Sequence, residues 1–145
     1  MTLPAYRALR FDLPLPSSDK EQPPSGLILK ADGRIETVDG EASVRQAILM
    51  LLSTRPGERL MRPGYGCDLS QLVFSVNDDT TAGLAAHYVR RAIEAWEPRV
   101  EIVDLVASRD PEAPEQLVVD ISYRVKATRR RADLGFRVLL QGGLP

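Results

Sequence analysis

The stretch TRPGERLMRPGYGCDL, residues 54–69, places two prolines, three glycines and three arginines around Glu58 and the apolar pair Leu60–Met61. It is too short to fold alone, so its prolines and glycines must shape a loop against a larger structure. The residues themselves leave two readings of its charges open. Glu58 could act as a catalytic acid, or the charged side chains could hold a fold or an assembly together.

A helix is predicted directly before this stretch. Ser43 and Gln46 have the spacing of a capping box, which predicts Ser43 as the N-cap with the Gln46 side chain reaching back to it. Pro56 disfavours helical backbone at the preceding residue, so the helix should end near Thr54. Its apolar residues recur at helical spacing and form one stripe: Val44, Ala47, Ile48, Leu51 and Leu52.

A second helix is predicted after the stretch. It should start near Asn77–Asp79, whose acidic residues suit a helix N-terminus. Pro98 should stop it. Trp96 is expected to pack on the core of the domain, because it ends a row at i, i+4 spacing that consists of Leu84, Tyr88, Ala92 and Trp96.

The rest of the chain predicts β-structure. Asp32–Gly33 is a good two-residue hairpin turn between residues 27–29 and 34–37. Three later strands are expected over residues 100–107, 117–125 and 134–140, and strict alternation in the second of them indicates one buried face. The fold class that follows is α+β, with a small, mainly antiparallel sheet packed with two main helices.

The first 26 residues are predicted to form an extended arm. They hold five of the eleven prolines and show neither a helical nor a strand period. Such an arm either stays disordered or packs on a neighbour. Residues 27–145 are then one α+β domain, with an open or partner-completed edge expected at the C-terminal strands.

Composition excludes several classes of function. The net charge is −1, which argues against a protein that binds nucleic acid by bulk electrostatics. Cys67 is the only cysteine, so no internal disulfide can form. The apolar runs are too short to span a membrane. Because no signal peptide is apparent either, we expect the chain to be made in the cytoplasm and kept there or built into a particle there.

No cofactor, metal or catalytic motif stands out. One histidine, His87, and one cysteine cannot make a zinc-type cluster, and no phosphate-loop, dinucleotide or nucleophile-elbow motif occurs. The strongest enzymatic hypothesis is glycoside hydrolysis by Glu58 with Asp68 or Glu97, since that reaction needs two carboxyl groups across a cleft. Three arginines flank Glu58, however, and positive charge favours the ionised form, whereas a general acid must hold its proton.

The helix that runs into residues 54–69, the acidic start of the second helix, and the later motif AWEPRVEI at residues 95–102 occur together at a specific spacing. With these motifs the chain resembles the W-like baseplate family of contractile phage tails, also called the phage lysozyme-like baseplate wedge family. Relatives occur in type VI secretion and in extracellular contractile injection systems. The resemblance covers most of residues 27–126.

The resemblance implies a sheath initiator, present in six copies between the wedges and the first sheath ring. Its terminal strands would offer an edge to sheath subunits, and tube or hub proteins are further possible partners; no nucleic acid or membrane is implied. The Glu97–Pro98–Arg99 motif would grip the helical core bundle of the wedge subunits, with the Arg99 fork on a partner carboxylate or carbonyl. No cofactor is implied. The alternative is a muramidase-like glycoside hydrolase that acts on peptidoglycan.

The resemblance also places the Gly57–Glu58–Arg59 motif in the core of the fold and gives residues 54–69 a structural role. Pro56 should end the helix and Gly57 allow the turn, after which residues 58–61 run as a short strand. Glu58 is expected to pair with an arginine, either a neighbour of Arg59 or Arg99. The full set of structural residues predicted here is Arg55, Gly57, Glu58, Arg59, Pro63 and Gly66.

Overall fold

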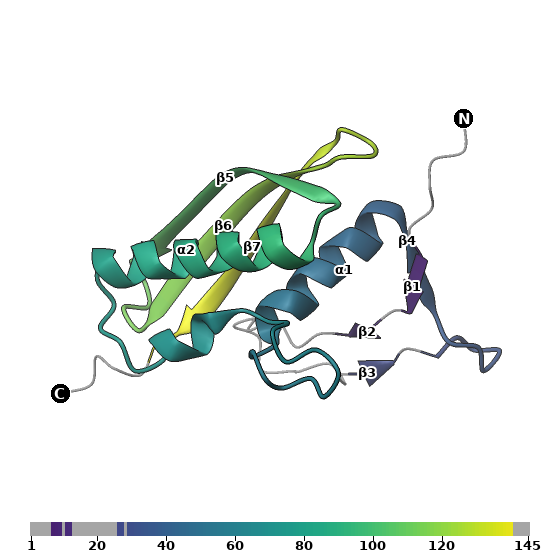
Figure 1. Cartoon of the computed structure of the whole chain (residues 1–145), viewed down its shortest axis with the longest axis horizontal. Helices are drawn as coiled ribbons and strands as arrows, with labels where there is room; N and C mark the ends of the chain where they lie inside the picture. Colours follow the sequence, from purple (N-terminus) through teal and green to yellow (C-terminus); the bar gives the residue numbers. More distant parts are fainter. Residues whose placement is uncertain (1–6, 10, 13–25, 28, 141–145) are drawn as a thin grey trace.

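Two helices lie on one side of a three-stranded antiparallel sheet (Figure 1). This computed structural model describes residues 7–9, 11–12, 26–27 and 29–140. The sheet has the order β5–β6–β7 and consists of β5 (Val100–Arg109), β6 (Gln116–Val125) and β7 (Arg131–Leu139). The helices are α1 (Gly40–Ser53) and α2 (Asp79–Trp96), with a 3-10 helix, η1 (Asp68–Leu72), between them. The predicted α+β class, with two main helices and antiparallel sheets, is confirmed.

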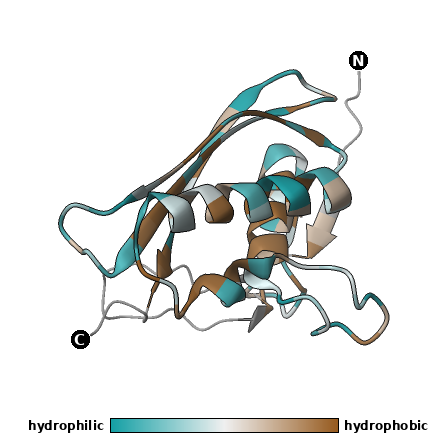
Figure 2. Cartoon of the chain, turned by 60° about the vertical axis from the view of Figure 1, so that its left-hand side comes forward, coloured by the Kyte–Doolittle hydropathy of each residue, from teal (hydrophilic) through white to brown (hydrophobic). Residues whose placement is uncertain are grey.

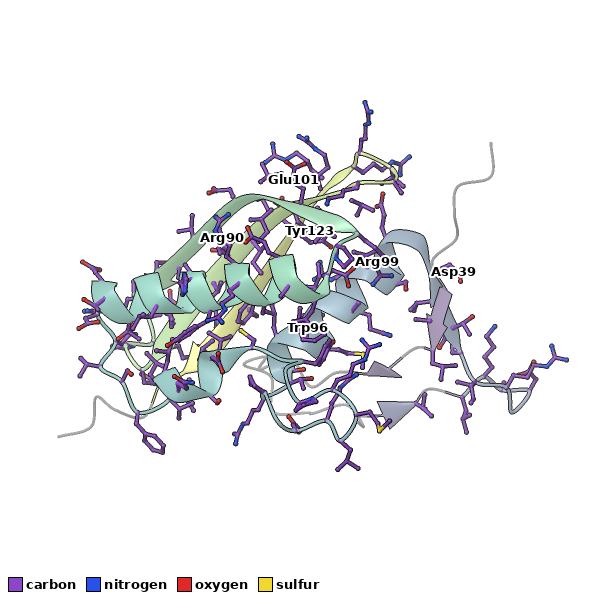
Figure 3. All side chains as sticks on the ribbon, in the orientation of Figure 1. Asp39, Arg90, Trp96, Arg99, Glu101 and Tyr123 are labelled. Atoms are coloured by element: carbon purple, nitrogen blue, oxygen red, sulfur yellow. The ribbon has the colours of Figure 1, made fainter. Side chains whose placement is uncertain are left out.

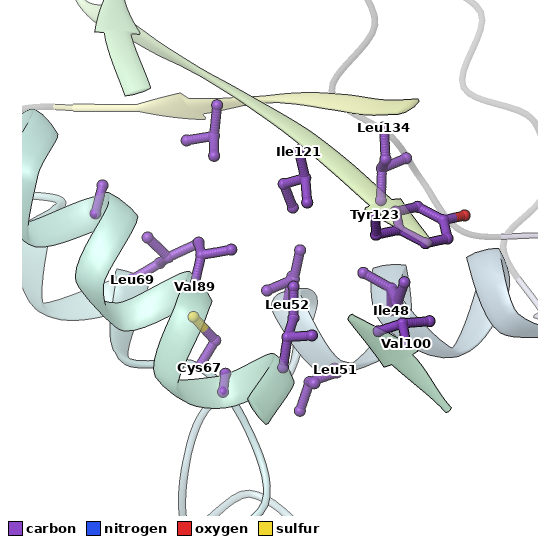
Figure 4. Close-up of a cluster of buried hydrophobic side chains, with 14 of the residues drawn as sticks. Ile48, Leu51, Leu52, Cys67, Leu69, Val89, Val100, Ile121, Tyr123 and Leu134 are labelled. Atoms are coloured by element: carbon purple, nitrogen blue, oxygen red, sulfur yellow. The ribbon is translucent and has the colours of Figure 1, made fainter. Parts of the chain in front are cut away.

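The core lies between the helices and the inner face of the sheet (Figure 4). Leu117, Val119, Ile121, Tyr123 and Val125 of β6 are each at most 1% exposed, so the predicted alternation is confirmed. Burial of a large apolar side chain stabilises the fold by about 1.5–3 kcal/mol. Colouring by hydropathy shows the brown, apolar side of each helix turned toward the sheet (Figure 2).

Short strands pair near the start of the chain. β1 (Arg7–Leu9) pairs with β4 (Thr37–Asp39), and β2 (Phe11–Asp12) pairs with β3 (Gly26–Leu27), in both cases antiparallel. A turn forms at the predicted Asp32–Gly33, with Gly33 at a φ of +80°, but it is not the predicted two-residue turn. The amide of Lys30 donates to the carbonyl of Arg34 at 2.8 Å around a three-residue loop, and the flanking residues share only the bridge between Leu29 and Ile35. Most of the predicted arm over residues 1–26 lies outside the described residues.

The predicted N-cap of α1 is wrong. The helix begins at Gly40, directly after β4, and its N-cap is Asp39. Ser43 is therefore a buried residue inside the helix, and the Gln46 side chain donates from Nε2 to the carbonyl of Leu9 at 2.7 Å. A contact with a segment far away in the sequence has overridden a local capping pattern.

The predicted boundaries of α2 are confirmed. Asp78 is the N-cap, and its side chain accepts a hydrogen bond from the amide of Thr81 at 2.8 Å. That bond lowers the pKa of the Asp78 carboxyl, because it stabilises the ionised form. The helix ends at Trp96, two residues before Pro98. No helix within the described ranges has the length and apolarity needed to cross a membrane.

Candidate functional site

The loop at residues 55–66, called the 55–66 loop below, is fastened by its own backbone. The amide of Gly57 donates to the carbonyl of Pro63 at 2.7 Å, and the amide of Cys67 donates to the carbonyl of Thr54 at 2.9 Å. Gly66 lies so close to the start of the loop that a Cβ there would be 2.7 Å from the carbonyl oxygen of Thr54. The predicted short strand over residues 58–61 is wrong, because these residues form successive turns.

Glu58 closes the first of these turns. Its Oε2 accepts a hydrogen bond from the backbone amide of Arg55 at 2.9 Å. The predicted ion pair between Glu58 and an arginine side chain does not form among the described residues: Arg99 pairs with Glu97, and Arg59 contacts the Tyr65 ring. The guanidinium carbon of Arg59 lies 4.4 Å from the centre of the Tyr65 ring, a cation–π contact. Glu58 is thus a turn-forming residue here.

The end of α2 carries a buried ion pair. Glu97, the C-cap of the helix, is 5% exposed, and its two carboxylate oxygens accept from Nε and Nη2 of Arg99 at 2.5 and 2.8 Å. This is the bidentate geometry that guanidinium groups favour. A carboxylate at this depth needs such a partner, since its burial without one is costly. The Arg99 fork that the sequence suggested for a partner protein is held by its own chain.

The 55–66 loop and the end of α2 form one packed unit. The rings of Tyr65 and Trp96 meet edge to face with centroids 5.5 Å apart. A Cβ on Gly64 would lie 3.4 Å from the Trp96 ring, so that ring rests on the loop backbone (Figure 3). Trp96 also packs against the buried core, as predicted. Burial raises the pKa of the Tyr65 hydroxyl.

Tyr65 is the residue of this unit that the sequence did not reveal. An aromatic residue between Gly64 and Gly66 was the available signal, because glycines on both sides allow a ring to lie flat against a neighbouring element. Through Tyr65 and Trp96 the two predicted motifs, Gly57–Glu58–Arg59 and Glu97–Pro98–Arg99, become neighbours in space.

A second feature is the outer edge of β7. β7 pairs with β6 on one side, and no strand in the described part of the chain pairs with its other side. Asp133 directs its carbonyl to this outer side, where it accepts from Nη1 of Arg45 on α1 at 3.1 Å. Backbone alternation then places the amides and carbonyls of Gly135, Arg137 and Leu139 on the same open side.

An apolar groove of about 570 Å³ lies along this edge, between α1, η1 and β7. Phe136 and Val138 of β7 turn their side chains toward it, since they pair with inward-facing residues of β6. Burial raises the pKa of the Cys67 thiol, which also lines the groove, to about 11. The remaining apolar lining residues are Leu49, Leu52, Leu69, Val73 and Leu139.

The three carboxylates considered for glycoside hydrolysis do not form a pair across a cleft. Glu58 lies on an exposed loop, both oxygens of Glu97 are occupied by Arg99, and Asp68 begins η1. The described residues that line the groove include no carboxylate. The residues covered by the structure also contain no group of three or more histidine, cysteine, aspartate or glutamate side chains that could hold a metal ion.

Comparison with known proteins gives the family. Residues 38–130 match the family model described as "Baseplate wedge protein gp25". The chain belongs to this family. The matched region contains both motifs of the packed unit, whereas β7 follows it.

Three known proteins are similar to this chain in sequence or fold. The baseplate wedge protein gp25 of Enterobacteria phage T4 is 30% identical over 88 residues, which span 59% of this chain and 64% of the phage protein. A candidate tail lysozyme from Geobacter sulfurreducens is 35% identical with a TM-score of 0.65, over 80% of this chain and 97% of that one. A chain of the anti-feeding prophage baseplate shares the fold, with a TM-score of 0.57 at 21% identity over 81% and 82% of the two chains.

Proposed function

We propose that this chain is a structural subunit of the baseplate of a contractile tail or injection particle, assembled in the cytoplasm. In six copies it links the wedge subunits to the first sheath ring, and β7 is the edge on which sheath assembly starts. Tube or hub proteins are possible further neighbours. The observation that carries the proposal is the open edge of β7 beside an apolar groove.

Both parts of that edge favour an added strand. Gly135, Arg137 and Leu139 offer backbone donors and acceptors in a row, which a strand from a sheath subunit would satisfy. Alternate side chains of the same strand would enter the groove and cover Phe136 and Val138. The other edge strand, β5, packs against α2 and carries an irregularity between Ile102 and Asp104, so it suits regular pairing less well.

The wedge contact is assigned to Glu97, Pro98 and Arg99. Pro98 is exposed, and the Arg99 side chain keeps 28% of its surface accessible. Because Glu97 already holds the guanidinium in one orientation, a further contact by Arg99 to the helical core bundle of the wedge would cost less ordering entropy. Arg55, Gly57, Glu58, Arg59, Pro63 and Gly66 support this surface from the 55–66 loop.

A point change in β7 tests the strand-addition role. Removal of residues 133–145 would be a poor test, because Leu134 is 1% exposed and its loss would open the core. Arg137→Pro instead removes one outward-facing amide without a ladder bond. We expect the number of sheaths in cells that carry Arg137→Pro to fall at least about tenfold, because a weakened edge contact lowers the affinity for the added strand. The variant itself should still be found in the baseplate.

Two controls accompany this variant. Arg137→Ala removes the ion pair with Asp110, at 3.7 Å, but keeps the amide, and should support normal sheaths. Ala107→Pro makes the corresponding change on the outer side of β5 and should also support them. Normal sheath number and length with Arg137→Pro, counted by electron microscopy, would contradict strand addition at β7.

A further inference from the structure

The tip of the 55–66 loop carries two large apolar side chains in water. Leu60 is 100% exposed and Met61 is 93% exposed. Neither side chain contributes burial to the fold of the isolated chain, and polar residues would serve equally well in these turns. An adjacent, fully exposed pair of this kind is typical of a contact with another molecule.

The loop presents this pair in a fixed position. The amide of Arg62 donates to the carbonyl of Arg59 at 3.3 Å, and the amide of Tyr65 donates to the carbonyl of Arg62 at 3.1 Å, so consecutive turns brace the tip. The base of the loop is held by the Tyr65–Trp96 ring contact. A tip that is ordered before binding loses less conformational entropy when a partner meets it.

The surroundings of the tip are positive. Arg55, Arg59 and Arg62 are all exposed on the loop, while the carboxylate of Glu58 is turned back onto the amide of Arg55. The complementary surface is therefore an apolar socket bordered by carboxylates. The groove beside β7 of a second copy is a poor match, because Arg55 and Arg137 line it and would repel the arginines of the tip.

We propose that Leu60 and Met61 form an anchor that inserts into an apolar socket, edged by aspartate or glutamate, on a neighbouring protein of the assembled particle. The anchor extends the surface formed by the 55–66 loop and the end of α2. It rests on the proposed function for the place of the partner, which is the baseplate. A protein socket fits the rigid tip better than a lipid surface does, since two side chains on one loop bury little area in a bilayer.

The double variant Leu60→Ser with Met61→Ser tests the anchor. Both residues are exposed, so the melting temperature should stay that of the wild type, while the amount of this chain in purified particles should fall at least about tenfold, as for loss of a central contact. Phe74→Ser is the matched control: Phe74 is 78% exposed and follows η1, outside the 55–66 loop, and this variant should be incorporated normally. Normal incorporation of the double variant would overturn the anchor and leave the proposed function intact. Absence of the wild-type chain from purified particles would overturn both.

A second measurement tests the chemistry of the socket. A photocrosslinking amino acid at position 60 should join the chain, in intact particles, to a peptide of another particle protein with acidic residues beside apolar ones. Arg62→Glu should reduce incorporation, and reversal of an acidic residue in that peptide should restore it. Crosslinks to a peptide without acidic residues would overturn the proposal. Flotation with phosphatidylglycerol vesicles that the double serine variant loses would also overturn it, in favour of a lipid surface.

Discussion

Arg99, which is proposed above to contact the wedge, also stabilises the fold. Its fork holds the Glu97 carboxylate, whose side chain is 7% exposed. Arg99→Ala should therefore lower the free energy of unfolding by roughly 3 kcal/mol, the low end of the range for a broken buried pair, because Arg99 itself is partly exposed. An arginine that contacted only a partner could instead be removed without effect on the stability of the isolated chain. Denaturant unfolding of the purified variant measures it.

A double-mutant cycle separates the pair from its surroundings. Glu97→Gln combined with Arg99→Ala leaves no unpaired charge, so the double variant should lose less stability than the sum of the single losses. Strictly additive losses, or an unchanged melt for Arg99→Ala, would show that the buried pair does not stabilise the fold. The wedge contact is then better probed with Arg99→Lys, which keeps the charge and loses the fork.

At the scale of the element, the 55–66 loop depends on two glycines in different surroundings. Gly66 has a φ of +139°, and a Cβ on it would lie within 2.8 Å of backbone atoms of Thr54, Arg55 and Pro56, whereas Gly57 has a φ of +87° and open space around it. Gly57→Ala should cost about 1–2 kcal/mol, the penalty of left-handed backbone alone. Gly66→Ala should cost more than about 2 kcal/mol, since rigid backbone must also move.

Chemical denaturation of the two alanine variants compares these costs directly. Gly64→Ala is the control within the same loop, because its Cβ would make an ordinary contact of 3.4 Å with Trp96. Equal losses for Gly57→Ala and Gly66→Ala would mean that the close approach at Gly66 is relieved by movement of the loop.

The helices and strands differ in how well the sequence predicted them, and the difference lies in the range of the interactions. The end of α1 before Pro56 and the start of α2 at Asp78 depend on nearby residues, and both were predicted. The start of α1 depends on β4 and on the contact from Gln46 to Leu9, so the capping pattern at Ser43 predicted the wrong N-cap. β7 begins at Arg131, before the predicted Leu134, because its pairing with β6 extends toward the turn.

Only part of the candidate site could be predicted from the sequence. Each motif could be recognised from its own residues. Glu97–Pro98–Arg99 lies at the expected helix end, whereas Glu58 and Arg59 were expected in a strand and lie in a loop. The contact between the two motifs through Tyr65 and Trp96 could not be predicted, because no local pattern specifies which distant ring will contact a tryptophan. The groove beside β7 is also a product of tertiary packing, which alternation within one strand does not define.

At the scale of the whole molecule, the open question of catalysis has a direct test. We expect the purified chain to release no soluble fragments from peptidoglycan, and Glu58→Gln to behave as the wild type, because the described carboxylates do not face one another across the groove. A muramidase of known activity serves as the positive control on the same substrate. Turnover by the wild type that Glu58→Gln abolishes would instead support the hydrolase alternative.

The hydrogen bond from Arg45 to Asp133 also affects the free, unassembled subunit. An unpaired strand edge attracts identical edges, and free subunits that paired in this way would form aggregates. The guanidinium of Arg45 occupies the carbonyl of Asp133 at 3.1 Å, so a second copy could pair along the whole of β7 only by displacing it. The stretch from Gly135 to Leu139 stays open to a shorter strand. If a partner strand adds to β7 as proposed above, this one hydrogen bond from α1 would limit the length of that strand and would disfavour pairing between two copies of the chain.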